Sequence, residues 1–311
     1  MRYTCKENGD VMGVIEARGL AKAYGGRRVV SDFNMSVAAG DIYGFVGRNG
    51  AGKSTVMKMI CGDAAPTAGE VVLFDGDGQG VRRVGVLIEQ PGLLPGLTAY
   101  ENVMAKALAL GMPDASARSC EVLRLVGLEA TGRKKVRGFS LGMRQRLGLA
   151  LALLGNPDVL LLDEPFNGLD PEATRAMRNL IVRLNGTLGL TVVISSHVLD
   201  QLDRMVTRYG VIADGRMVRQ MTAEEVAAEC TSSLRVRTAD AARTLALLEE
   251  AFPGARFTAY PDGSLMIAGV YDAEPVARRL RDADQIVLEF SQDTRDIEDY
   301  FVELMEGGSH V

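Results

Sequence analysis

Two short stretches of the chain carry residue types and spacings suited to phosphate chemistry. The first, Gly47-Arg-Asn-Gly-Ala-Gly-Lys-Ser-Thr55, fits the pattern G-x-x-x-x-G-K-[ST] of a phosphate-binding loop. Its glycines let backbone N–H groups face phosphate oxygens, and the helix expected after them adds a positive dipole end. We expect Lys53 to neutralise the β- and γ-phosphates and the Ser54 hydroxyl to reach Mg²⁺. The nucleotide-binding residues predicted here are Gly47, Asn49, Gly50, Ala51, Gly52, Lys53, Ser54 and Thr55.

The second stretch, Val159-Leu-Leu-Leu-Asp163-Glu164-Pro165, is an apolar run that ends in two adjacent carboxylates. In α/β sheets, ligands bind outside the carboxyl ends of the strands. Asp163 could hold Mg²⁺ there, and Glu164 could orient and deprotonate an attacking water, a role that phosphoryl transfer requires. Taken alone, the pair could equally be a strand-end turn with solvated acids. In a chain that also carries the loop at Lys53, it predicts ATP hydrolysis.

These residues need a sheet to position them, and the sequence pattern supplies one. Short apolar runs alternate with helical patterns from Val14 to about Gln220, which is typical of an α/β domain. The expected central strands are Ile42–Val46, Val84–Ile88, Val159–Leu162, Val192–Ser195 and Gly210–Ala213. Several of them are near-continuous apolar runs, which is typical of strands buried on both faces. Between Pro91 and Arg137 the pattern is mainly helical, and Thr98-Ala-Tyr-Glu101 is a capping box that opens a helix through about Leu110.

From about Thr222 the pattern changes to that of a small α+β domain. The predicted order is β-α-β-β-α-β, which suggests a ferredoxin-like arrangement. The strands are expected at Leu234–Thr238, Ala255–Tyr260, Ser264–Ala268 and Gln285–Phe290, the intervening helices at Asp240–Ala251 and Ala273–Arg281, and a last helix at Thr294–Met305. We therefore divide the chain into an N-terminal tail (1–13), a large α/β domain (14–221, with a helical subdomain at about 91–155) and an accessory domain (222–311).

Composition narrows the class of protein. The 311 residues are 47% hydrophobic and 24% charged, with a net charge of −5, so a sizeable core is possible and no basic field for nucleic acid is expected. The longest apolar stretch, Leu147–Gly155, is far short of the ~20 residues that span a bilayer. The first residues carry no apolar signal segment, and four scattered cysteines predict reduced thiols in a cytoplasmic protein.

Together these motifs resemble the nucleotide-binding subunits of ABC transporters, over roughly Val14–Gln220. The resemblance implies a P-loop ATPase cassette with a helical subdomain, cofactors ATP and Mg²⁺, and the positions of further site residues. It implies that Tyr24 stacks on adenine, that Gln90 touches Mg²⁺ or water, and that His197 contacts the γ-phosphate. Each has a plainer alternative: a turn residue, a polar loop residue and a strand-end histidine, respectively. Asp170 matches a loop that crosses the dimer interface, and it also suits the N-cap before Pro171.

The family's signature segment departs from its usual Leu-Ser-Gly-Gly-Gln. Here it is Phe139-Ser140-Leu141-Gly142-Met143, which keeps Ser140 and Gly142 as a hydroxyl and a close-approach backbone at a helix N-terminus to hold the γ-phosphate. The same residues also predict a Ser-capped buried helix running to Gly155. The variant resembles the bacitracin-resistance and lantibiotic-immunity branch of exporter ATPases.

That resemblance implies the partners. The expected assembly is a head-to-tail dimer with a second copy, closed by ATP, on a separate transmembrane permease at the inner face of the plasma membrane. The apolar loop Pro91–Leu97 follows Gln90, where the family receives the permease, although partial burial in the home fold would also explain its leucines. The exported cargo would be a peptide antibiotic or a small amphipathic compound. Two alternatives to an exporter ATPase remain: an ABC protein that acts on ribosomes or DNA, and a regulator that only binds ATP.

Overall fold

The structure is a computed structural model of the chain. It describes residues 13–74, 84–89, 91–202, 205–230, 233–268, 273–293 and 297–307. By its internal contacts the chain forms two compact units, one of Met1–Thr222 with Leu304–Val311 and one of Ala223–Glu303. Each unit is described separately below.

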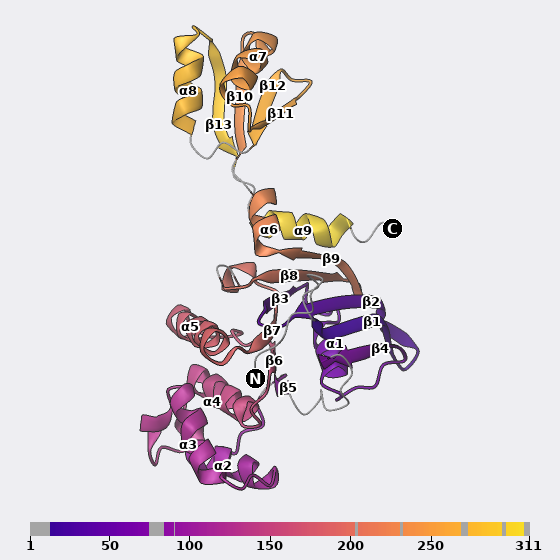
Figure 1. Cartoon of the computed structure of the whole chain (residues 1–311), viewed down its shortest axis with the longest axis vertical. Helices are drawn as coiled ribbons and strands as arrows, with labels where there is room; N and C mark the ends of the chain where they lie inside the picture. The colour runs from indigo at the N-terminus through magenta and orange to yellow at the C-terminus, as the bar shows by residue number, and fades with distance from the viewer. Residues whose placement is uncertain are drawn as a thin grey trace, which may run out of the picture. The chain divides into compact units, whose positions relative to one another are not determined.

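A six-stranded sheet is the centre of the first unit, with strand order β5-β6-β7-β3-β8-β9 (Figure 1). Its strands are β5 (Val84–Leu87), β6 (Val159–Asp163), β7 (Thr191–Ser196), β3 (Ile42–Val46), β8 (Arg208–Ala213) and β9 (Arg216–Thr222). All neighbours are parallel except β8 and β9. Every residue of β3, β6 and β7 is buried, as expected for apolar strands covered on both faces. The five central strands predicted from the sequence are confirmed.

A second, antiparallel sheet of the same unit was not predicted. It has the order β2-β1-β4, formed by β1 (Gly13–Tyr24), β2 (Arg27–Ala38) and β4 (Ala68–Leu73). Its apolar face shares a core with the six-stranded sheet, and Phe33 meets Phe45 edge to face with ring centroids 5.7 Å apart. Helix α1 (Lys53–Ile60) packs against β1, β2 and β6, so it is held between the two sheets.

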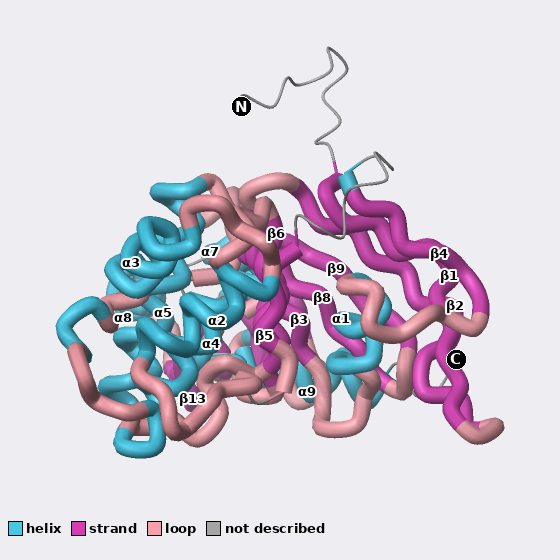
Figure 2. Tube along the Cα trace, turned by 90° about the horizontal axis from the view of Figure 1, so that it is seen from below, coloured by secondary structure: helices cyan, strands magenta, loops and turns pink. Residues whose placement is uncertain are grey.

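The helical part of this unit contains α2 (Ala99–Ala109), α3 (Ala115–Leu125) and α4 (Leu141–Leu153). The predicted capping box is present: Glu101 N donates to Thr98 Oγ1, and Thr98 N donates to the Glu101 carboxylate. That backbone donor lowers the pKa of Glu101. Figure 2 shows these helices on one side of the central strands and β1, β2 and β4 on the other. Helix α5 (Pro171–Leu188) contacts α4 and buries one apolar stripe.

The second unit has the predicted β-α-β-β-α-β order. Its elements are β10 (Ser233–Thr238), α7 (Ala241–Ala251), β11 (Arg256–Ala259), β12 (Ser264–Ala268), α8 (Ala273–Asp282) and β13 (Val287–Asp293). The sheet is antiparallel with order β11-β12-β10-β13, the ferredoxin-like arrangement. The buried residues of its small core are Leu234, Val236, Leu248, Ile267, Val276 and Leu280. Helix α6 (Ala223–Glu229) precedes this sheet, and α9 (Ile297–Gly307) ends the described chain.

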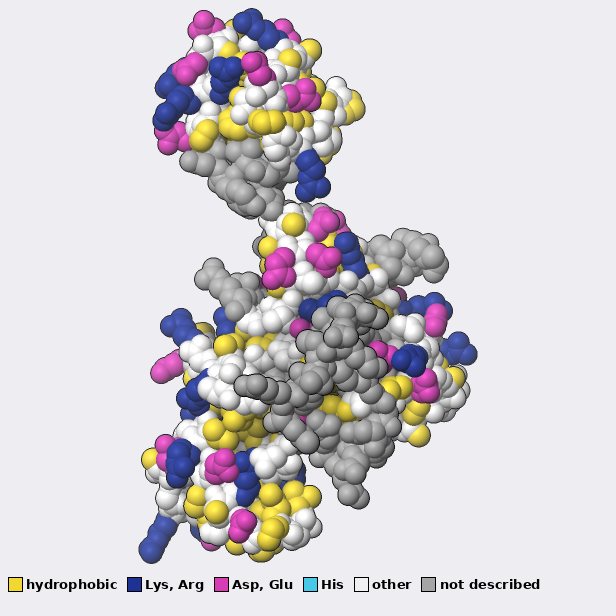
Figure 3. Space-filling model, viewed as in Figure 1, with side chains coloured by type: hydrophobic (Ala, Val, Ile, Leu, Met, Phe, Trp, Pro, Cys, Tyr) yellow, Lys and Arg dark blue, Asp and Glu magenta, His cyan; other side chains and the backbone are white. Residues whose placement is uncertain are grey.

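No helix in the described part of the chain is long and apolar enough to cross a membrane. On the face drawn in Figure 3, hydrophobic side chains gather over α2–α4. The large hydrophobic residues exposed in and beside these helices include Leu94, Leu108 and Leu110.

Candidate nucleotide site

The phosphate-binding loop lies between β3 and α1. Gly50 and Gly52 have φ of +83° and +107°, which an L side chain rarely adopts. A Cβ at Gly47 would lie 2.6 Å from both Ile212 Cγ2 and the Ile212 carbonyl oxygen, so this position also requires glycine. Helix α1 has Gly52 as its N-cap, no side-chain cap and no acidic residue in its first turn. Its first N–H groups are therefore available to an anion.

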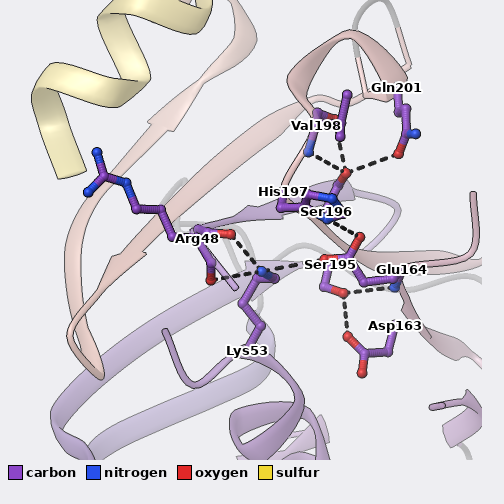
Figure 4. A network of polar contacts seen from close by, with 10 residues as sticks. Arg48, Lys53, Asp163, Glu164, Ser195, Ser196, His197, Val198 and Gln201 are labelled. Atoms are coloured by element: carbon purple, nitrogen blue, oxygen red, sulfur yellow. Dashed lines mark hydrogen bonds and ion pairs between the residues drawn. The ribbon is translucent and has the colours of Figure 1, made fainter. Parts of the chain in front are cut away.

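Lys53 is buried beside this loop, with only 6% of the residue exposed. Its Nζ donates to the carbonyl oxygens of Gly47, at 2.6 Å, and Arg48, at 3.3 Å. It also lies 3.4 Å from Glu164 Oε1. The ammonium group is thus held between the loop and the end of β6 (Figure 4). In this position it can neutralise phosphate oxygens bound by the loop.

The two carboxylates at the end of β6 are positioned by a serine on the neighbouring strand. Asp163 pairs in register with Ser195 of β7. The Ser195 hydroxyl donates to Asp163 Oδ1, and its oxygen accepts a hydrogen bond of 2.9 Å from Glu164 N. Ser195 itself is fully buried. This hydroxyl therefore orients both acidic residues at once, and the sequence analysis missed it.

Glu164 contacts both a lysine and a histidine. Its backbone has φ of +48°, unusual for a residue other than glycine, and this turn places the side chain at the mouth of the site. One carboxylate oxygen, Oε2, lies 2.8 Å from His197 Nδ1. The other, Oε1, is buried; it forms an ion pair with Lys53 Nζ but has no hydrogen-bond partner among the described residues. A buried carboxylate oxygen without a donor is suited to accept a hydrogen bond from a bound water.

His197 follows β7, where a short polar network holds its backbone. Ser196 Oγ accepts from Val198 N at 3.0 Å, donates to Val198 O at 2.9 Å and contacts Gln201 Oε1 at 3.2 Å. The imidazole is directed at Glu164 rather than at a buried partner (Figure 4). The arrangement fits an orienting role better than a strand-end histidine that only satisfies its own turn.

The donor set at this site fits Mg²⁺. Asp163 offers a carboxylate at the carboxyl end of β6, and Ser54 offers a hydroxyl in the first turn of α1, which packs against β6. Oxygen ligands are those that Mg²⁺ prefers, and it keeps water and substrate phosphates in the rest of its octahedron. The described residues contain no group of three or more His, Cys, Asp or Glu that could hold a metal ion.

Tyr24 ends β1 with 49% of the residue exposed, next to the turn at Gly25 and Gly26. Lys22 Nζ lies 5.0 Å from the centre of its ring. An exposed ring anchored at a strand end can stack on a base. Among the described residues, no hydrogen bond or ion pair connects Tyr24 with the network around Lys53.

Ser140 and Gly142 begin α4, on a different element from the loop. Ser140 is its N-cap, with Oγ accepting from Met143 N at 3.3 Å, as predicted for a Ser-capped helix. Gly142 is buried, and a Cβ there would lie 3.2 Å from Ala173 Cβ on α5. Asp170 caps α5, accepting from Ala173 N at 2.7 Å, with Pro171 at the first helical position. The hydrogen bonds of Ser140 and Asp170 therefore stay within their own helix ends.

The loop Pro91–Leu97 is held by Asn102 of α2, a second residue that the sequence analysis missed. Asn102 is buried; its Oδ1 accepts from Leu94 N at 2.7 Å, and its Nδ2 donates to the carbonyl oxygens of Leu94 and Thr98. The clamp leaves Leu94 51% exposed. Gln90, predicted to contact Mg²⁺ or water, lies outside the described residues.

This loop lines a groove of about 720 Å³ that extends to the carboxylates. Its walls include Pro91 and Leu93 of the loop, Arg144 of α4, and Asp163 and Glu164. A partner in this groove would thus contact the loop and the end of β6 together. Two buried side-chain oxygens in the wall of this groove have no hydrogen-bond partner among the described residues. They are Glu164 Oε1 and Gln145 Oε1.

Comparison with known proteins identifies relatives over nearly the whole length of the chain. The family model described as "ABC transporter" matches residues 30–167. The bacitracin transport ATP-binding protein BcrA of Bacillus licheniformis is 36% identical over 302 residues, covering 95% of this chain and 98% of that protein. The lantibiotic transport ATP-binding protein SrtF of Streptococcus pyogenes is 36% identical over 208 residues, covering 66% of this chain and 89% of that one.

Solved structures of ATP-binding subunits match about two thirds of this chain. CbiO1 of Clostridium perfringens, part of the transporter complex cbiONQ, has a TM-score of 0.64 at 26% identity and covers 70% of this chain and 91% of its own. The dimeric ATP-binding cassette MJ0796, bound to ADP and Pi in a post-hydrolysis state, has a TM-score of 0.60 at 28% identity, covering 67% of this chain and 98% of its own.

Proposed function

This chain belongs to the ABC transporter ATP-binding proteins, and we propose that it hydrolyses ATP to drive a separate membrane permease exporting a peptide antibiotic or a similar amphipathic compound. One observation carries the ATPase assignment. Lys53, Glu164 and His197, from three separate segments, contact one another beside a phosphate-binding loop. A regulator that only bound ATP would need the loop and Lys53, but not a paired, partly unsatisfied Glu164.

In this proposal, each residue acts on ATP as follows. The loop from Gly47 to Thr55 binds the phosphates through its backbone amides, and Lys53 moves from the loop carbonyls to phosphate oxygens. Glu164 accepts a proton from the water that attacks the γ-phosphorus. Its Oε1, which is near Lys53 but has no hydrogen bond among the described residues, is the oxygen proposed to accept from that water. His197 holds the opposite oxygen of Glu164 and faces the γ-phosphate. Tyr24 stacks on the adenine ring.

Mg²⁺ would be held by Ser54, Asp163 and Gln90, and it supplies neutralisation of phosphate charge. The role of Ser195 is then to keep the Asp163 carboxylate turned toward that ion while holding the Glu164 backbone. A carboxylate that is already oriented needs no rearrangement when the nucleotide binds.

The second half of the site would come from another copy of the chain. Ser140 and Gly142 of one copy, with Asp170 near the interface, would face the phosphate loop of the other in a two-fold, head-to-tail dimer. The proposal is supported by the start of α4, whose hydrogen bonds stay within its own helix, and by the dimeric assembly of the similar cassette MJ0796.

The permease would dock in the groove beside the Pro91–Leu97 loop and hold the subunit at the inner membrane face. We propose that residues 14–221 form the motor domain, with the helical subdomain at 91–155 as the docking part, and that 222–311 form an accessory domain. Leu94 supports this surface, because it is exposed in the same loop whose Leu93 lines the groove. Replacing Leu93, Leu94 and Leu97 by polar residues should release the subunit from membranes while its basal ATPase persists.

The cargo proposal rests on the relatives named for bacitracin and lantibiotic transport. It is tested by deleting the gene in its host and measuring growth against cyclic and lanthionine-containing peptides. Sensitivity of the deletion strain that is reversed by the wild-type chain, and not by Glu164→Gln, would support export of that peptide. Unchanged sensitivity to both peptide classes, in a host where the permease is expressed, would reject the cargo proposal and leave the ATPase assignment standing.

A further inference from the structure

The second residue of the phosphate loop, Arg48, takes no part in the network around Lys53 through its side chain. In Figure 4 the Arg48 side chain points away from Glu164 and toward the pale yellow helix, α9. Its Nη2 lies 2.7 Å from Glu306 Oε1, although the two residues are 258 positions apart in sequence. The last turn of α9 is thus tied to the loop that binds phosphate.

A second contact of the same turn supports this placement. Met305, together with Arg48, Asn49 and Gly50 of the loop, lines a cavity of about 200 Å³ whose remaining wall comes from the end of β8. Leu304–Val311 groups by contacts with the first unit, not with the accessory sheet. The end of α9 is therefore part of the surroundings of the phosphate loop.

The Arg48–Glu306 ion pair lowers the positive charge that the phosphate loop offers to a nucleotide. Arg48 and Lys53 are the cationic side chains of the loop, and ATP brings several negative charges to it. Glu306 neutralises Arg48, and the C-terminal end of α9, at Gly307, adds the negative end of a helix dipole. Both effects lower the positive potential at the loop, so they act against the binding of an anion.

We propose that the last turn of α9 is an autoinhibitory latch on the phosphate loop: Glu306 holds Arg48 away from the nucleotide, and ATP binding and the latch oppose each other. The proposal rests on the loop being the ATP site. Because linkage is reciprocal, ATP weakens the latch by the same factor by which the latch weakens ATP binding. ATP loading would in this way be communicated to the C-terminal end of the chain.

The solvent exposure of the Arg48–Glu306 pair sets the expected change in ATP affinity. The side chains of Arg48 and Glu306 are 60% and 62% exposed, and pairs of this kind are weak and screened by salt. Removing the Glu306 charge should therefore strengthen ATP binding about two- to fivefold at low ionic strength. A contact this weak is suited to a reversible switch rather than to holding the fold together.

The test is a double-mutant cycle on the full-length chain, with the dissociation constant for Mg-ATP measured by calorimetry at low salt. Glu306→Gln should bind ATP two- to fivefold more tightly than wild type, while Glu306→Gln in an Arg48→Gln background should bind like Arg48→Gln alone. Asp299→Asn, which removes one charge from the same helix two turns earlier, is the matched control and should bind like wild type. At high salt the difference between wild type and Glu306→Gln should shrink.

A second measurement follows the latch itself: ATP should speed hydrogen exchange at the amides of residues 304–307 in wild type and not in Glu306→Gln. The latch is rejected if Glu306→Gln binds ATP like wild type, or if its effect is the same with and without Arg48. Lys53→Ala separates the two hypotheses. If it binds ATP as well as wild type, the nucleotide site is misassigned; if it loses ATP while Glu306→Gln matches wild type, only the latch fails.

Discussion

In the phosphate-loop half of the proposed site, side chains from separate segments contact one another, whereas in the signature half Ser140 and Gly142 are satisfied by their own surroundings. Lys53 reaches Glu164, Glu164 reaches His197, and Ser195 holds the acidic pair. Ser140 only caps α4, and Gly142 only allows α5 to approach. The first half is assembled by folding alone, whereas under the proposed dimer the second half would be completed by another copy of the chain.

The two halves should therefore differ in how stability and activity respond to mutation. A network built within one chain should respond to mutation in the isolated subunit, in both stability and activity. A surface that is completed only by another copy should respond in activity alone, and in a manner that depends on protein concentration. The four predictions below test this contrast, from the largest expected effect to the smallest.

Glu164→Gln should lower the rate of ATP hydrolysis about 10²- to 10⁴-fold while leaving ATP affinity near the wild-type value. The amide keeps the shape of the side chain and loses the proton acceptor, whereas binding depends on Lys53 and the loop amides. Steady-state phosphate release and calorimetry on the purified chain measure the two quantities. Glu172→Gln, in the first turn of α5, is the control and should hydrolyse normally. Near-normal turnover of Glu164→Gln would exclude Glu164 as the base.

Lys53→Ala and Ser140→Asp should each be inactive alone, and an equal mixture should recover about a quarter of wild-type turnover, because about half of the dimers are mixed and each has one intact site of two. Aspartate is as good an N-cap as serine, so Ser140→Asp should keep α4 while placing a negative charge against the γ-phosphate. Ser140→Asn, neutral and also a good cap, is the matched control and should retain more activity.

Wild-type turnover per subunit should also rise with protein concentration. If the mixture shows no recovery and wild-type turnover is independent of concentration at every dilution, the site lies within one chain. That pair of results would remove the contrast between the two halves.

Ser195→Ala should lower the hydrolysis rate about 10- to 100-fold, because Asp163 and the Glu164 amide lose the hydroxyl that orients them. Leaving these buried groups unpaired should also cost about 1–3 kcal/mol of unfolding free energy. The control is Thr191→Val, which removes a buried hydroxyl from the other end of β7, where it accepts from Gly40 N. It should lower stability with little change in rate. Equal rate losses in both variants would mean that Ser195 acts only through stability.

Deleting Ala223–Val311 should leave a folded, ATP-binding subunit, because every proposed nucleotide residue precedes Gln220. With Glu306 gone, ATP should bind about two- to fivefold more tightly, as in Glu306→Gln. Thermal unfolding and ATP titration measure both effects. A truncated chain that is folded but has lost ATP affinity would show that the accessory segment completes the site, contrary to the proposed division.

The elements that hold the site could largely be predicted from local pattern. The strand Ile42–Val46 has the predicted bounds. Strand β6 is one residue longer than predicted at its carboxyl end, and β7 is one residue longer at both ends. Buried parallel strands leave a clear signal because both faces require apolar residues. The antiparallel sheet β2-β1-β4 left a weaker signal: β1 mixes Glu16, Arg18 and Lys22 with its apolar residues and contains a glycine at positive φ. Its pairing also shifts register at several points, which disturbs the two-residue alternation.

Positioning residues were harder to predict than reacting ones. Lys53 and Glu164 stand in motifs whose spacing is set by the chemistry of phosphate. Ser195 and Asn102 act by hydrogen bonds to a neighbouring segment, and the fold decides which segment that is. A serine in a strand or an asparagine in a helix is common in any fold, so neither residue type is a signal by itself. Ser195 did leave a usable signal, since it precedes Ser196-His197 at the carboxyl end of a predicted parallel strand, where ligands bind.

From the sequence alone we could predict the phosphate loop, the acidic pair, the buried strands and the β-α-β-β-α-β order, because each depends on residues close together in the chain. The tertiary structure was needed to show that Ser195 bonds to Asp163, that Lys53 pairs with Glu164 Oε1, and that Glu306 reaches Arg48. These contacts join residues that are tens to hundreds of positions apart, and no local periodicity encodes which of them meet. Strand order and helix packing set these distances, and a single sequence does not state them.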